Sequence, residues 1–146
     1  VRPGCWYGRD MMGVGPMYLG GHGQCFDERQ KRVVKRIGSN LTHNETAFHF
    51  LYWAFSSNPN HLSCRMTELD DFTLNVISDE RALEVLNDYP FAAPQFEDRG
   101  DGVVVGIRRL SDGRVAKAYF NFADECRETD GIFLPPHFAR LMLSDL

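Results

Sequence analysis

The sequence predicts a helix-rich region followed by an antiparallel β region, because the two kinds of pattern occupy different parts of the chain. Helix signals dominate up to about residue 94 of the 146 residues. After that point, short apolar runs flank Asp-Gly turns, which is the pattern of β-hairpins. Elements segregated in this way indicate two modules, residues 1–94 and residues 95–146, joined near residues 92–98.

The composition is typical of a globular protein. Hydrophobic residues make up 43% of the chain and charged residues 25%. The formal net charge of -4 gives no electrostatic reason to expect a nucleic acid partner. No run of about 18 apolar residues occurs, so we expect no membrane-spanning helix and no membrane partner.

The most informative stretch, residues 4–15, holds a tryptophan and a carboxylate between glycines, which let a backbone turn sharply and approach a ligand closely. Asp10 lies beside Trp6 and Met11. An aromatic ring can stack on the apolar face of a sugar, and a carboxylate can accept hydrogen bonds from hydroxyl groups. On spacing alone, Asp10 is the strongest candidate for a ligand-binding residue, although a structural role in the loop is the preferred interpretation. Since the first residue is Val1, we expect a processed chain or a piece of a longer one.

The first half of the chain predicts a loop and then helices. Residues 1–24, rich in Gly and Met, predict a strand end followed by a long loop. Residues 26–37 predict a helix, because acidic residues come early and basic residues late, as the helix dipole favours. The helix over residues 45–56, capped by Asn44 or Thr46, is apolar nearly all round and should be buried on several sides.

The remaining elements follow from caps and turns. Two further helical stretches begin at Thr67 and at Ser78, and the link over residues 60–66 has room for a short strand. Beyond Pro94 we expect strands over residues 102–107 and 114–122 around an Asp-Gly turn, a second Asp-Gly turn at residues 130–131, and strands over 132–134 and 138–143.

Two other constellations have more ordinary explanations. His22 and Cys25, with His61 and Cys64, could supply four zinc ligands, but structural zinc sites favour tighter, Cys-dominated patterns. Unrelated side chains are the preferred interpretation, and we assign no metal ligand. The neighbouring residues 70 and 71 are carboxylates that would point about 100° apart on a helix, so we interpret them as first-turn partners of the dipole rather than a catalytic pair.

Several segments, in this order, resemble the alpha-galactosidase and alpha-N-acetylgalactosaminidase family of glycoside hydrolases. Residues 4–15 resemble its motif G-G-W-N-D-P-D-M-L-x-x-G, and residues 51–59 its helix end L-W-A-I-x-x-S-P. Residues 83–90 resemble E-V-I-A-I-N-Q-D-P. Residues 112–121 are similar to D-G-x-x-A-V-A-L-F-N, and residues 134–143 to L-P-P-H-G-x-x-L-L-x-L.

The resemblance implies a fold of class α/β plus β. Residues 1–94 would be the last βα units of a (β/α)8 barrel, and residues 95–146 an antiparallel β-sandwich. The family cleaves terminal alpha-linked galactose-type sugars with retention, using two aspartates that lie upstream of the tryptophan motif. This chain would hold neither of them, and would contribute Trp6, Asp10 and Met11 as substrate-binding residues.

The resemblance also implies partners and a setting. No catalytic residue and no cofactor are expected in this segment, and the partners would be a carbohydrate substrate and the upstream part of the barrel, with a homo-oligomer left open. A secreted, periplasmic or lysosomal-type compartment would suit such an enzyme. Residues 7–9 depart from the family's Asn-Asp-Pro, which favours the alternative of a non-catalytic carbohydrate-binding or interaction protein on the same fold.

Overall fold

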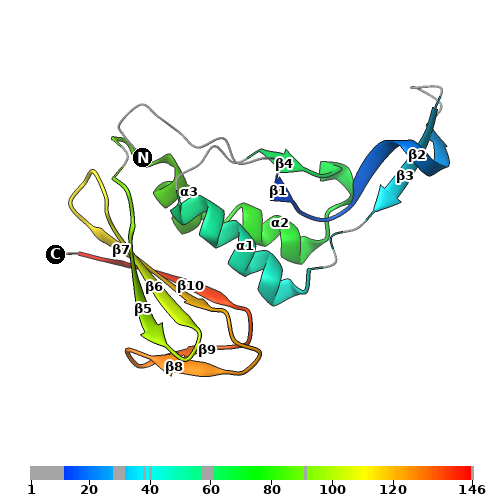
Figure 1. Ribbon diagram of the computed structural model, residues 1–146. Coiled ribbons are helices and arrows are strands. Elements are labelled where there is room, and N and C mark those ends of the chain that lie inside the picture. The colour runs from blue at the N-terminus through cyan, green and yellow to red at the C-terminus, as the bar shows by residue number, and fades with distance from the viewer. Residues whose placement is uncertain are drawn as a thin grey trace.

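The computed structural model describes residues 12–27, 32–37, 39, 41–56, 61–90 and 92–145 (Figure 1). Helices lie in the first part of the chain and an antiparallel sheet in the second, as the element order shows. The elements are β1 (Met12–Gly13), β2 (Met17–Asp27), β3 (Arg32–Ile37), α1 (His43–Phe55), β4 (Leu62–Ser63), a 3-10 turn (Met66–Glu68), α2 (Asp71–Ile77), α3 (Glu80–Asn87), β5 (Gln95–Gly100), β6 (Val103–Arg109), β7 (Val115–Asn121), β8 (Arg127–Thr129), β9 (Ile132–Leu134) and β10 (Ala139–Ser144).

Two short strands, one before α1 in the sequence and one after it, form a parallel pair. Strand β1 pairs with β4 in parallel, with Met12 opposite Leu62 and Gly13 opposite Ser63. The Met12 backbone N–H donates to the carbonyl of His61 over 2.7 Å. Parallel neighbours need a crossover connection, and α1 supplies it, so β1, α1 and β4 form a β–α–β unit.

The second part of the chain forms a four-stranded antiparallel sheet in the order β10-β7-β6-β5, with the separate hairpin β8-β9 beside it (Figure 1). Alternate side chains on each strand point to opposite faces of the sheet, where they pack into two different hydrophobic clusters. Ala116, Ala118 and Phe120 join a cluster with Phe50 and Phe55 of α1. Side chains from the strands β6, β7 and β9 form a second cluster, made of Val103, Val105, Tyr119 and Leu134.

The helix starts explain why these segments are helical. Thr42 caps α1 through a reciprocal box with Glu45, two residues before the first of the expected caps, Asn44 and Thr46. Asp70 caps α2 by accepting from the Thr73 N–H at 2.6 Å, and Asp79 caps α3 by accepting from the Ala82 N–H at 3.0 Å. The helix expected from Thr67 is instead a 3-10 turn that ends before α2 begins.

The helix predicted over residues 26–37 is wrong, as is the loop predicted for residues 17–24. Strands β2 and β3 pair antiparallel here, with an irregularity between residues 20 and 25. The charge order along residues 26–37 suited a helix dipole, but Val33, Val34 and Ile37 are β-branched and favour extended backbone. Tertiary pairing also overrides the weak preference that a charge gradient supplies.

The predicted hairpins are confirmed. The Asp112-Gly113 turn joins β6 to β7, and the Leu110 N–H donates to the Arg114 carbonyl over 2.8 Å. Asp130 and Gly131 both have positive φ, as a two-residue primed turn requires. Strand β5 had no sequence signal, because its residues QFEDRG are exposed and mostly polar. Within the described residues, no helix has both the length and the apolar character needed to cross a bilayer.

Candidate functional site

The three predicted sugar-binding residues, Trp6, Asp10 and Met11, lie outside the described residues. The structure does describe the strand that follows them, because β1 begins at Met12. The candidate site is therefore built from the carboxyl ends of β1 and β4, where parallel strands of α/β proteins place their functional loops.

A backbone hydrogen bond joins the segments that leave these two carboxyl ends, because the Arg65 N–H donates to the carbonyl of Pro16 over 2.9 Å. A second one, from the Ser39 N–H to the carbonyl of Gly15 over 3.1 Å, joins the segment after β1 to the segment before α1. Gly15 has φ +63°, and a Cβ there would lie 2.5 Å from Cδ2 of Leu69. The positive φ favours glycine here, and without a side chain the loop that leaves β1 approaches Leu69 closely.

Polar side chains described at this edge include Cys64, Arg65 and Glu68. Burial raises the pKa of the Cys64 thiol, so that the thiol stays protonated at neutral pH and is a poor nucleophile. The Arg65 guanidinium donates to the Glu68 carboxylate over 2.8 Å, which satisfies part of its charge locally. These groups can position a polar ligand, and none of them forms the spaced carboxylate pair that glycoside hydrolysis requires.

The structure leaves the zinc hypothesis without support in its described part. His61 is exposed and Cys64 half-buried, while the side chains of His22 and Cys25 lie outside the described residues. Among the residues that are described, no group of three or more His, Cys, Asp or Glu side chains is placed to hold a metal ion.

The interpretation of residues 70 and 71 is confirmed. Asp70 is the cap of α2 and Asp71 lies in its first turn. Hydrogen bonds from the Thr73 backbone and side chain lower the pKa of the Asp70 carboxyl, which therefore acts as an ionised cap.

A buried ion pair that links α3 to the sheet was missed from sequence. The Arg108 side chain of β6 is fully buried and donates to the Val85 carbonyl at 2.7 Å and to the Asp88 carboxylate at 3.2 Å. Asp88 also accepts from the hydroxyl of Ser111 at 2.6 Å. Burial lowers the pKa of Arg108, and the Asp88 charge opposes that shift. No sequence pattern flagged Arg108, because an arginine within an apolar strand normally indicates an exposed face.

The face of α1 that points away from α2 is apolar and open. A hollow of about 360 Å³ is lined by Phe48, His49 and Tyr52 of the helix, with Phe122 and His137 from the sheet side. Burial lowers the pKa of His49, and its buried Nδ1 has no hydrogen-bond partner among the described residues. An exposed apolar patch often marks a contact surface. A buried polar atom without a hydrogen bond is costly, and a partner packed on this face could supply one, so both observations give the face the character of a contact surface.

The chain matches no protein-family model and no curated protein. It does match solved structures. One is a GH27 β-L-arabinopyranosidase from Geobacillus stearothermophilus, at 17% identity and a TM-score of 0.74, with 97% of this chain and 37% of that chain covered. Another is alpha-galactosidase I from Mortierella vinacea, at 15% identity and a TM-score of 0.66, with 72% of this chain and 36% of that chain covered.

A third match is the alpha-galactosidase of Saccharomyces cerevisiae, solved with raffinose, at 18% identity and a TM-score of 0.53. It covers 61% of this chain and 22% of that chain. The likeness to alpha-galactosidases inferred from sequence is therefore confirmed at the level of the fold. The chain spans well under half the length of each of these three proteins.

Proposed function

We propose that this chain is the C-terminal part of a retaining glycoside hydrolase that acts on terminal alpha-linked galactose-type sugars. In this proposal residues 1–94 are the last βα units of its barrel and residues 95–146 its β-sandwich. The observation that carries the proposal is that residues 12 and 13, within the tryptophan motif, form β1 and pair in parallel with β4, as neighbouring barrel strands do. Gly15, the last residue of the motif, lies just beyond the carboxyl end of β1, the end at which α/β barrels carry their substrate-binding loops.

The proposed roles of the residues follow from the family that the sequence resembles. In that family the nucleophile and the acid/base, about 5 Å apart in retaining enzymes, lie upstream of the tryptophan motif, so they would come from earlier strands. Asp10 would accept hydrogen bonds from sugar hydroxyls, while Trp6 and Met11 would shape the pocket wall.

The upstream part of the barrel is the proposed partner of the open face of α1. In a barrel each helix packs between two neighbours, whereas the described contacts of α1 are with α2, α3, β7 and β10. No residue of α2 or α3 lines the hollow that Phe48, His49 and Tyr52 border. A preceding helix would bury these rings and offer a partner to the His49 imidazole.

The test is hydrolysis of 4-nitrophenyl α-galactoside and 4-nitrophenyl β-L-arabinopyranoside by the full polypeptide in which this sequence occurs. Asp10→Ala should lower kcat/KM about 10- to 100-fold, the usual cost of losing a charged hydrogen bond to a ligand. Asp71→Ala, an exposed change on α2, is the matched control and should leave kcat/KM unchanged. The 146-residue chain alone should show no turnover.

Hydrolysis by the chain alone, or a complete lack of hydrolysis by the full polypeptide, would contradict the proposal. The alternative, a non-catalytic carbohydrate-binding or interaction protein on the same fold, is favoured by the unusual residues 7–9. It predicts glycan binding without turnover that survives Asp10→Ala.

A further inference from the structure

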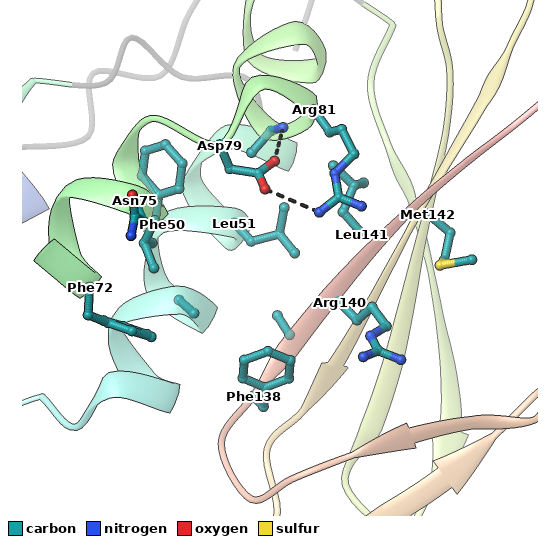
Figure 2. A pocket seen from close by; sticks show the side chains of 14 residues that line it. Phe50, Leu51, Phe72, Asn75, Asp79, Arg81, Phe138, Arg140, Leu141 and Met142 are labelled. Atoms are coloured by element: carbon teal, nitrogen blue, oxygen red, sulfur yellow. Dashed lines mark hydrogen bonds and ion pairs between the residues drawn. The ribbon is translucent and has the colours of Figure 1, made fainter.

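A second concavity of about 510 Å³ lies between the helices and β10 (Figure 2), and no residue of β1 or β4 lines it. One wall is helical and carries Phe50 of α1 with Phe72 and Val76 of α2. The opposite wall is β10, and consecutive residues 138–142 line the hollow. Since successive strand residues point to opposite faces of a sheet, a hollow that touches all of them must run along the edge of the strand.

This edge of β10 has open backbone groups. Strand β10 is the outermost strand of its sheet and pairs only with β7. The Asn121 N–H donates to the Phe138 carbonyl, so the even-numbered residues of β10 exchange hydrogen bonds with β7. The backbone N–H and C=O groups of Ala139, Leu141 and Leu143 therefore point to the groove, where no described residue bonds to them.

The two faces beside this edge differ in character. Leu141 points to the helices and is buried, whereas Arg140 and Met142 lie on the opposite face of the strand and are exposed. No described residue forms an ion pair with Arg140. Arg81, across the groove, is already paired with Asp79 at 3.2 Å, as the dashed line in Figure 2 shows. A strand added here would have one apolar face and one face beside an unneutralised cation.

The groove between β10 and the helices limits how large a bound segment can be. Sheet neighbours lie about 4.8 Å apart, so one further strand fits against the edge of β10. Phe72 and Val76 of α2 line the groove on the side opposite β10, and Figure 2 shows Phe72 on that helical side. The edge-to-edge joining of a second copy of this chain would bring its own helices against this wall.

We propose that this groove binds an extended acidic peptide segment, which adds to β10 as a fifth strand of the sheet. Apolar side chains of the peptide pack beside Leu141 and the phenylalanines, and acidic side chains on its other face pair with Arg140. Main-chain hydrogen bonds to Ala139, Leu141 and Leu143 supply affinity, and the alternation of side chains supplies selectivity. This peptide site is separate from the proposed sugar site, and the peptide proposal does not depend on the proposed glycoside hydrolase function.

The test uses two synthetic probes, an eight-residue peptide of alternating valine and glutamate and its counterpart of alternating valine and lysine. Fluorescence anisotropy should show that the chain binds the glutamate peptide at least tenfold more tightly than the lysine peptide. Arg140→Glu should reverse this preference. Arg109→Glu makes the same charge change on an exposed residue of β6 and should leave the preference unchanged.

Hydrogen exchange in the unmodified chain provides a readout that needs no variant. The glutamate peptide should slow exchange of the Ala139, Leu141 and Leu143 amides, and the Arg140 and Met142 amides, already paired with β7, should change little. The proposal fails if neither peptide binds, if Arg140→Glu leaves the preference as it was, or if protection appears elsewhere. Dimerisation of the chain through β10 would also overturn it, in favour of a second copy as occupant.

Discussion

Single side chains tie the helical part of this chain to its sheet. The Arg108 guanidinium reaches the carbonyl of Val85 and the carboxylate of Asp88, and the same carboxylate accepts from Ser111. A buried ion pair adds little net stability over an apolar pair of the same shape, but removal of one partner leaves a charge stranded in the interior. The arrangement therefore fixes where α3 ends relative to β6.

Asp88→Ala is expected to destabilise the chain by about 3 kcal/mol, because it leaves the Arg108 charge buried without its counter-charge. Denaturant unfolding followed by circular dichroism measures this change. The matched control is Glu84→Ala. Glu84 also lies on α3, and its carboxylate pairs at the surface with Arg114, the residue just before β7. Such exposed pairs contribute little, so a similar loss in both variants would contradict the prediction.

His49 should make stability depend on pH. Burial lowers its pKa in the folded chain below the ordinary value of about 6.5. As pH falls through that ordinary value, the unfolded chain takes up a proton before the folded chain does, so stability is lost. The free energy of unfolding should be lower at pH 5.5 than at pH 7.5. His49→Phe should remove part of this difference, and His61→Phe, at an exposed position, should not.

Among the elements, α1 determines how the layers meet. It lies between the parallel pair β1–β4 and the four-stranded sheet, and its Phe50, Leu51 and Phe55 are all buried. A strand with a large side chain at the crossing point would hold the helix away. Gly106 of β6 instead lets the Phe55 ring lie directly on the sheet, because an added Cβ would come within 2.6 Å of that ring.

Gly106→Ala should therefore destabilise the chain by about 1–3 kcal/mol through overpacking against Phe55. Thermal unfolding measures this cost. The smaller side chain of a Phe55→Leu background should reduce the penalty, and the double-mutant cycle gives the coupling between the two positions. Equal penalties in both backgrounds would show that the close approach of the ring is not the cause.

The described part of the molecule shows two open surfaces of different kinds. The outer face of α1 is aromatic and contains a histidine nitrogen that has no hydrogen-bond partner among the described residues, which suits a large packed neighbour. The edge of β10 offers backbone groups and a cation, which suits a thin extended segment. Phe122 is 51% exposed beside the first surface, so the isolated chain carries apolar area that water disfavours.

The isolated chain is expected to self-associate through this aromatic face. Analytical ultracentrifugation over a range of concentrations should show a larger mean mass as concentration rises, and Phe122→Ser should weaken the association. Phe133→Ser changes a similarly exposed ring on β9 and serves as the control. If both variants associate as the unmodified chain does, the contact lies elsewhere.

The sequence by itself determined the features that depend on local chemistry. Asp112-Gly113 and Asp130-Gly131 predicted their hairpins, because Gly113, Asp130 and Gly131 have positive φ, which few residues besides glycine, asparagine and aspartate accept. Asp70 was rightly placed in the first turn region of a helix, and the ordered motifs led to the likeness of fold that solved structures confirm.

Only the tertiary structure decided the rest, because it depends on partners far away in sequence. Residues 32–37 have a charge order that a helix tolerates, yet pairing with β2 makes them a strand. Strand β5 carries no apolar pattern and exists because β6 lies beside it. The burial of Arg108 and the open edge of β10 likewise follow from which strands became neighbours, a choice made by the packing of the whole chain and visible in no local window of its sequence.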